Sequence, residues 1–251
     1  MRKIILLPVV MLVVLSCNQN EKEQKKDISA LNAQEILDKS ILYHDPNNSF
    51  GKTKIDIHIQ EPRIQNPYRY SKIIMDNNEN TFMLKRNRGN RVAEYYKDKD
   101  GELSVLLDGK IEQDTSLIRQ FRLDTSFVNG YSNYYQIMLG LPMSMTSYAK
   151  TVNGGDITGF DGKYCYKIDI EIKESVISTQ WHLYISTYDF SLVGVELINE
   201  EDNTKGERLV YEDLIKIEGI NYPKIRHWRD RNSNDYLGSD ILLYNEDILV
   251  E

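Results

Sequence analysis

Apolar and polar residues alternate with a period of two through much of this chain. Isoleucines alternate with polar residues over residues 55–59, and the same pattern recurs over residues 164–172, 181–185, 193–197 and 215–217. Successive side chains of a β-strand point to opposite faces, so each segment predicts a strand with one buried face. This pattern restricts the chain to a fold that is dominated by β-sheet.

Turn signals separate the predicted strands at short spacing. Asp100-Gly101 and Asp108-Gly109 flank one strand and suit tight hairpins, because such turns need residues that adopt positive φ. Further reversals are predicted at Asn153-Gly154-Gly155, Asp161-Gly162 and Glu218-Gly219. Strands that are joined by hairpins, without a helix after each strand, form an antiparallel sheet. The predicted fold class is therefore mainly β (α+β).

Two segments have a helical pattern instead. Over residues 32–44 the apolar residues fall on one helical face, and Asn32 and Glu35 have the spacing of a capping box. Over residues 131–139, tyrosine, methionine and leucine recur at helical spacing until Gly140 ends the segment. Such a stripe is typical of a helix that faces a core. Methionine also adapts to irregular apolar partners, so a ligand pocket is the alternative.

The start of the chain predicts export. Arg2 and Lys3 precede an apolar stretch, residues 4–15, which is shorter than the ~20 residues that span a bilayer and has the length of a signal-peptide core. It ends in Val-Leu-Ser-Cys at residues 14–17, which resembles the lipobox of bacterial lipoproteins. The resemblance implies cleavage before Cys17 and diacylation of its thiol. Two or three acyl chains anchor a protein almost permanently, since each buried methylene contributes ~0.8 kcal/mol.

These features divide the chain into three parts. Residues 1–16 are predicted to be a signal peptide, residues 17–27 the lipidated cysteine with a flexible tether, and residues 28–251 a single β-rich half-barrel domain. The predicted location is the bacterial cell envelope, with the anchor in the outer membrane, facing the periplasm or the cell surface. The membrane is a predicted partner through the acyl groups on Cys17, and the sequence identifies no protein partner.

Charge and motif content exclude several functions. The formal net charge of −7 argues against nucleic-acid binding, which needs a concentrated positive surface. The sequence has no Gly-x-Ser-x-Gly elbow, His-Glu-x-x-His motif, P-loop or Cys-x-x-Cys pair, so no catalytic residue, metal ligand or cofactor is predicted. Cys165 has no partner once Cys17 is acylated, and the alternation predicts that its thiol lies on the polar face of its strand.

Two polar groups are candidates for a functional site. His44 and Asp45 would make an acid/base pair, but the end of a helix favours a histidine that binds carbonyl groups or the helix dipole. The basic segment Lys224–Arg231 would receive an acidic headgroup or a partner protein, or else pair with acidic residues of adjacent strands. Alternation splits this segment between two faces of the sheet, which favours the pairing.

Four short segments, taken in order, resemble a known family. They are Tyr43-His44-Asp45-Pro46, Gly140-Leu141-Pro142-Met143, Gly219-Ile220-Asn221-Tyr222-Pro223-Lys224 and Leu237-Gly238-Ser239-Asp240-Ile241. Together they resemble a Bacteroidota family of lipoproteins of unknown function over about residues 30–245. The third segment is also similar to the lipoprotein-carrier (LolA/LolB-like) superfold. That resemblance implies a curved antiparallel half-barrel whose concave face is covered by helices and holds acyl chains, and it implies no catalytic residues.

An open half-barrel leaves an apolar concave face that helices must cover or a ligand must fill. We therefore predict a cavity that binds a lipid or another hydrophobic small molecule. Its predicted lining comes from the strands and from the helical cover: Ile57, Phe82, Leu84, Tyr166, Ile168, Trp181 and Leu183, with Tyr135, Met138, Leu139 and Met143. The alternative is a non-catalytic interaction or scaffold subunit of an envelope complex with a fully packed interior. An enzyme with an unrecognised site ranks third.

Overall fold

The computed structural model describes residues 31–174 and 177–244. The predicted signal peptide, the tether with Cys17 and the predicted start of the domain at residue 28 lie outside the described residues. Residues from Asn32 onward form one compact unit. Across residues 31–174 and 177–244, no helix has the length and apolar character that a membrane crossing requires.

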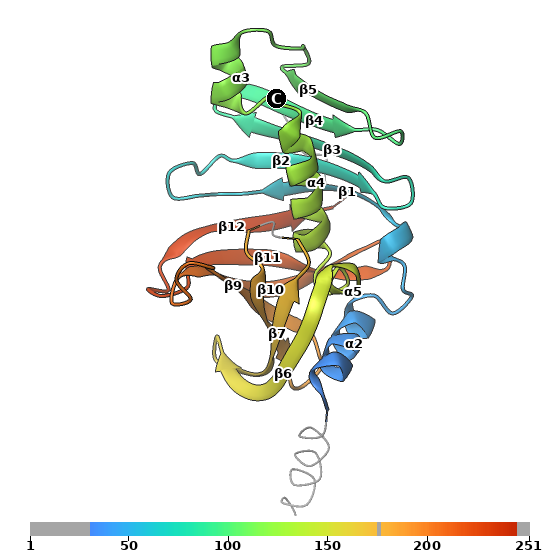
Figure 1. Cartoon of the computed structure of the whole chain (residues 1–251), viewed down its shortest axis with the longest axis vertical. Coiled ribbons are helices and arrows are strands. Elements are labelled where there is room, and N and C mark those ends of the chain that lie inside the picture. The colour runs from blue at the N-terminus through green and yellow to red at the C-terminus, as the bar shows by residue number, and fades with distance from the viewer. Residues whose placement is uncertain (1–30, 175–176, 245–251) are drawn as a thin grey trace, which may run out of the picture. The chain divides into compact units, whose positions relative to one another are not determined.

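Twelve strands of the described residues form one antiparallel sheet (Figure 1). Its order is β5-β4-β3-β2-β1-β12-β11-β10-β9-β8-β7-β6, so the sheet is open, with β5 and β6 at its two free edges. The predicted fold class, an open antiparallel half-barrel with helices, is confirmed. The strands are β1 (Lys54–Gln60), β2 (Tyr70–Asp76), β3 (Thr81–Arg88), β4 (Arg91–Lys97), β5 (Leu103–Leu107), β6 (Ala149–Phe160), β7 (Lys163–Ile172), β8 (Gln180–Ser186), β9 (Leu192–Ile198), β10 (Gly206–Ile217), β11 (Ile220–Asp230) and β12 (Tyr236–Leu243).

The register of the first five strands aligns their apolar residues in rows. Ile57 is opposite Ile73 on β2, Ile73 is opposite Leu84 on β3, and Leu84 is opposite Tyr95 on β4. Tyr95 is opposite Val105 on β5, and all five side chains are buried. Cross-strand neighbours on one face pack together, and full burial of one such side chain contributes about 1.5–3 kcal/mol. The period of two therefore produces a continuous apolar face.

Helix α4 (Ser126–Leu139) covers this apolar face (Figure 1). Its Val128, Tyr135 and Leu139 join the same buried cluster as the residues of β1–β5. The helix ends before Gly140, as predicted. A Cβ atom at position 140 would collide with the ring of Phe50, so only glycine allows this close approach.

The helices that follow β5 connect the two free edges of the sheet. In chain order they are α3 (Thr115–Phe121), α4 and α5 (Met145–Tyr148), and β6 follows at Ala149. Because β5 and β6 lie at opposite edges, this connection runs back over one face of the sheet, and α4 is its longest piece.

The first described helix, α2 (Ala33–His44), begins at the predicted capping box. The Asn32 side chain accepts a hydrogen bond from the Glu35 backbone N–H at 3.0 Å, and the Glu35 carboxylate accepts one from the Asn32 N–H at 2.9 Å. These two bonds satisfy backbone donors that a helix start leaves without partners. A short 3-10 turn, η1 (Phe50–Lys52), then leads into β1.

The predicted chain reversal at residues 153–155 is wrong. These residues lie inside β6, at a shift in its register with β7. Gly155 has φ +109°, and a Cβ atom there would lie 3.2 Å from Cδ1 of Ile36. The glycine therefore forms a bulge against which α2 packs closely, rather than a hairpin.

The predicted exposure of Cys165 is also wrong. Its side chain is buried in a small cluster with Phe160, Tyr184, Val193 and Val210. The alternation did predict opposite faces for successive residues, but here apolar side chains cover both faces of the sheet. Burial accordingly raises the pKa of the Cys165 thiol to about 11.

Candidate ligand-binding cavity

The residues predicted to line a hydrophobic cavity are all buried, with at most 5% of each exposed. Six belong to the cluster between α4 and the sheet: Ile57, Phe82, Leu84, Tyr135, Leu139 and Met143. Tyr166 and Ile168 lie on β7, Trp181 and Leu183 on β8, and Ile168 is opposite Leu183. Met138 is buried on α4. None of these side chains lines the cavity described next, so their role in ligand binding stays a prediction.

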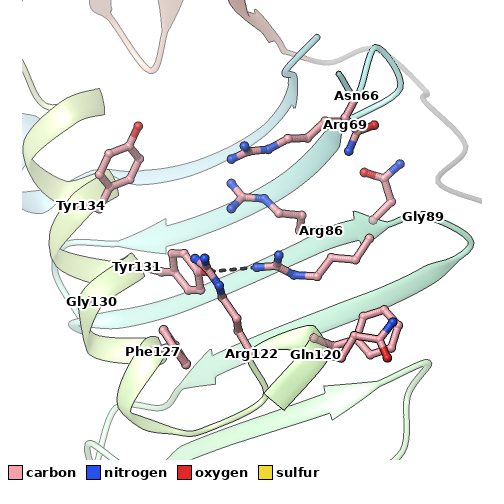
Figure 2. A pocket seen from close by; sticks show the side chains of 13 residues that line it. Asn66, Arg69, Arg86, Gly89, Gln120, Arg122, Phe127, Gly130, Tyr131 and Tyr134 are labelled. Atoms are coloured by element: carbon pink, nitrogen blue, oxygen red, sulfur yellow. Dashed lines mark hydrogen bonds between the residues drawn. The ribbon is translucent and has the colours of Figure 1, made fainter. Parts of the chain in front are cut away.

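A cavity with a volume of about 640 Å³ opens beside α4 (Figure 2). This volume lies within the ~300–1,000 Å³ of typical ligand sites. Two other cavities have volumes of about 160 and 260 Å³. We call the first one the arginine cavity, after the four arginines among its lining residues. It is lined by Asn66, Arg69, Arg86, Asn87, Arg88, Gly89, Gln120, Phe121, Arg122, Phe127, Gly130, Tyr131 and Tyr134.

A buried hydrogen-bond network holds Arg86 in place. Its Nε donates to Oγ of Ser71 at 2.9 Å, and its Nη2 donates to Oε1 of Glu61 at 3.1 Å and to the hydroxyl of Tyr135. Nε of Arg69 donates to the other Glu61 oxygen at 3.1 Å. Burial raises the pKa of Glu61, but the positive charges of Arg86 and Arg69 outweigh it and hold that pKa below its ordinary value. One ionised carboxylate therefore pairs with two guanidinium groups.

The other two arginines have no acidic partner within the described residues. Nη2 of Arg88 donates to the hydroxyl of Tyr131 at 2.9 Å, whereas its Nε is buried without a hydrogen-bond partner. Arg122 lies over the ring of Phe127, 6.0 Å from its centroid. The four guanidinium groups and Glu61 leave a formal surplus of three positive charges, in a chain whose net charge is −7.

Aromatic rings form the side of the cavity that α4 contributes. The rings of Phe127 and Tyr131 are stacked with their centroids 6.3 Å apart, and Tyr131 meets Tyr95 edge-on at 4.9 Å. The guanidinium of Arg86 lies 5.6 Å from the centroid of the Tyr131 ring. Arginine beside aromatic faces makes favourable cation–π contacts. The cavity therefore combines donors for an acidic group with apolar surface for a ligand body.

His44 forms backbone hydrogen bonds, as its position at the helix end predicted. Its Nδ1 lies 2.6 Å from the carbonyl oxygen of Asn221, and its Nε2 accepts the backbone N–H of Leu192 at 3.0 Å. With Nδ1 donating and Nε2 accepting, the ring is neutral. Burial lowers the pKa of His44, which agrees with the neutral form. This histidine joins α2 to β9 and β11.

Two residues of the basic segment 224–231 pair with acidic residues, which confirms the expected pairing in part. His227 lies 3.0 Å from Glu212, and Arg231 lies 3.1 Å from Glu196. Trp228 also donates its Nε1 to Asp240 at 2.8 Å. Nε of Arg226 and Nε of Arg229 are buried without a hydrogen-bond partner among the described residues, as are the hydroxyls of Tyr211 and Tyr222.

The arginines of the cavity are not among the predicted site residues, although the alternation along β3 indicates them. Its alternation buries Phe82 and Leu84, and the same phase places Arg86 and Arg88 on that face. A charged residue at a predicted core position usually needs a specific partner or function. No group of three or more His, Cys, Asp or Glu side chains that could hold a metal ion occurs in the part of the chain that the structure describes.

The fold agrees with a known class of proteins. The crystal structure of a LolA superfamily protein from Nitrosomonas europaea is similar, with a TM-score of 0.53, 11% sequence identity, and coverage of 88% of this chain and 96% of that chain. This likeness shows that the open sheet with its helical cover is a LolA-like fold. The chain itself belongs to DUF6503, a family of unknown function, whose model matches residues 2–245.

Two further solved structures show weaker similarity. One is a DUF1329 family protein from Desulfovibrio piger, with a TM-score of 0.45, 11% identity, and coverage of 87% of this chain and 95% of that chain. The other is a domain described as outer membrane lipoprotein-sorting from Vibrio parahaemolyticus, with a TM-score of 0.42, 8% identity, and coverage of 90% and 95%. No curated protein matches the sequence.

Proposed function

We propose that this protein is a lipid-anchored, non-catalytic protein of the bacterial cell envelope that binds a lipid or another amphiphilic molecule beside α4. The observation that carries the proposal is the arginine cavity, a ligand-sized hollow of about 640 Å³ at the border between the helical cover and the sheet. The LolA-like fold supports it by analogy only, because a shared fold does not imply a shared function.

The proposed location is supported by the first residues of the sequence. Their charged start, short apolar stretch and Val-Leu-Ser-Cys ending have the order of a lipoprotein signal. In this proposal the signal peptide is removed, Cys17 carries the acyl chains in the outer membrane, and residues 18–27 connect the anchor to the folded unit. Because the net charge of the protein is negative, anionic headgroups repel the domain, and the acyl chains alone attach it to the membrane.

Ligand binding is proposed to use the two kinds of surface that meet in the cavity. The rings of Phe127 and Tyr131 offer apolar contact, and the guanidinium groups opposite them offer hydrogen-bond donors (Figure 2). The packed cluster under α4 would form the rigid floor, because its side chains are already in contact with one another.

Native mass spectrometry of the protein purified from its own membrane tests the proposal. We expect one mass increment for the acyl groups on Cys17 and a second, dissociable increment for a retained amphiphile. A fluorescent fatty acid titrated into the unlipidated domain from residue 28 should bind saturably. If neither a retained amphiphile nor saturable binding is found, the binding proposal is wrong. The mass increment on Cys17 tests the lipid anchor independently of ligand binding.

A variant that fills the cavity, compared with a matched control elsewhere on the fold, tests where the ligand binds. Gly130 lines the cavity from α4, and a Cβ atom added there meets nothing within 4 Å, so the side chain of Gly130→Trp projects into open space. Replacing a helix glycine does not destabilise the helix. Gly159→Trp makes the same change on β6, also with open space around it and away from the cavity. Binding should be lost in Gly130→Trp and kept in Gly159→Trp.

A further inference from the structure

We infer that the arginine cavity recognises the acidic group of an anionic amphiphile, a phosphate or a carboxylate carried on an apolar chain, and that Arg88 and Arg122 bind this group directly. The inference rests on the proposed function and adds the chemical class of the ligand.

The charge of the cavity is the first observation. Its lining includes four arginines and no aspartate or glutamate, although the chain as a whole has seven more acidic than basic residues. Glu61 does not line the cavity, and its carboxylate forms ion pairs with both Arg69 and Arg86. Guanidinium groups gathered in a partly enclosed site repel one another, and low-dielectric walls strengthen their field. An anion that enters the cavity relieves this repulsion.

The arrangement of the arginines is the second observation. Arg69, Arg86 and Arg122 extend from three different segments toward the space beside Tyr131 (Figure 2). Arg69 directly precedes β2, Arg86 lies on β3, and Arg122 directly follows α3. Guanidinium groups suit a phosphate or carboxylate, because their planar donors form paired hydrogen bonds to two oxygens.

Unused hydrogen-bonding capacity is the third observation. Nε of Arg88 is buried, and no acceptor among the described residues binds it. Buried donors of this kind are rarely left unsatisfied in proteins. Arg122 forms no ion pair within residues 31–174 and 177–244, and its guanidinium group lies over the Phe127 ring. The two arginines without acidic partners are therefore the direct ligands, and Arg86 is a positioning residue that Glu61 and Ser71 hold.

The aromatic side of the cavity indicates that the anion carries an apolar body. Phe121, Phe127, Tyr131 and Tyr134 line the same space as the guanidinium groups. An inorganic anion alone would leave these rings in water, whereas an alkyl or aryl chain would cover them. The membrane supplies such molecules as acidic lipids, and free phosphate is the competing source of the same acidic group.

Calorimetric titration of the domain from residue 28 tests the inference, because the residues from Asn32 form a compact unit of their own. The probes are dodecyl phosphate, dodecanol and inorganic phosphate, each kept below its micellar concentration where that applies. We expect dodecyl phosphate to bind at least tenfold more tightly than either dodecanol or inorganic phosphate, and to weaken as the salt concentration rises. Arg88→Gln and Arg122→Gln should each lower its affinity at least tenfold and leave that of dodecanol unchanged.

Arg119→Gln is the control variant. It removes the same charge from α3, close to Arg122, but Arg119 is exposed and does not line the cavity, so binding by this variant should match that of the unaltered domain. Arg122 is exposed as well, so Arg122→Gln keeps the test valid if Arg88→Gln fails to fold.

The outcomes separate the inference from the proposed function. If dodecanol binds as tightly as dodecyl phosphate, the inference is overturned and the proposed function stands. If inorganic phosphate binds as tightly as dodecyl phosphate, the cavity recognises the acidic group, and the claim that the ligand carries an apolar chain is wrong. If neither amphiphile binds but phosphate does, the proposed function fails and anion binding survives. If nothing binds, both are wrong.

Discussion

Glu61→Gln tests whether one carboxylate supports the whole arginine network. The side chain of Glu61 accepts hydrogen bonds from Arg86, Arg69 and Ser71, and both Glu61 and Arg86 are buried. Glutamine keeps the shape of the side chain but removes the charge that balances two guanidinium groups. Breaking one partner of a buried ion pair typically costs about 3–5 kcal/mol, and some hydrogen bonds to the amide oxygen remain. We therefore expect a loss of about 3 kcal/mol in the free energy of unfolding at pH 7.

Asp56→Asn is the matched control, because it makes the same acid-to-amide change on β1. Asp56 lies 3.4 Å from Lys72, and 47% and 31% of the two side chains are exposed. Exposed ion pairs contribute little, so this variant should lose less than ~1 kcal/mol. Urea denaturation of both variants and of the unaltered domain gives the comparison.

The pH dependence adds a second requirement. The pKa of Glu61 is below its ordinary value of 4.5 in the folded protein, so the unfolded chain binds the proton first as the pH falls. The carboxylate therefore contributes fully above pH 4.5, and its contribution is lost as the pH falls through the lowered pKa. The stability curves of the unaltered domain and Glu61→Gln should converge below pH 4.5. A difference under 1 kcal/mol at pH 7, or one that stays constant into acid, would refute the reasoning.

Three further variants or reagents test the packing. His44→Ala leaves the buried Leu192 N–H and Asn221 carbonyl without their partner and should cost about 2–4 kcal/mol in urea denaturation, and a loss below 1 kcal/mol would contradict this role. Cys165, with its pKa raised to about 11 by burial, should not react with a thiol reagent at pH 8 until urea unfolds the domain, and rapid labelling of the folded state would show that the thiol is accessible. Leu139→Ala should cost about 2–5 kcal/mol in the same denaturation assay, whereas Leu42→Ala, at a side chain that is 61% exposed, should cost under ~0.5 kcal/mol, and equal losses would argue against the core position of Leu139.

Local signals predicted the local elements of this fold. The capping box at Asn32 and Glu35 needs only residues three apart, and the structure contains both of its hydrogen bonds. The end of α4 at Gly140 is equally local, and so is the turn at Asp108-Gly109, where both residues have positive φ as predicted, although helix α3 rather than a paired strand follows it. Period-two alternation likewise assigned the buried face of β1, where one face packs and the other is open to solvent. These features could be predicted because their causes lie within one turn or one strand.

Features that depend on distant segments could not be predicted in this way. Cys165 is buried because residues as far away as Val210 cover the outer face of its strand. The pairing of β1 with β12 joins His58 to Leu243, and no local pattern specifies that register. The arginine cavity depends on Arg86 reaching Glu61, which is 25 residues earlier in the chain.

The route of the chain from β5 to β6 limits how the helices that cover the sheet can move. The two strands are the opposite margins of a twelve-stranded sheet, about 50 Å apart when measured along it. Helix α4, with 14 residues, accounts for about 21 Å of that path. The segment that covers the sheet is therefore joined to a strand at each of its ends, and it cannot open by rotation about a single hinge. The arginine cavity opens beside this segment, and its lining residues come from β3, from α4 and from the chain at the end of α3.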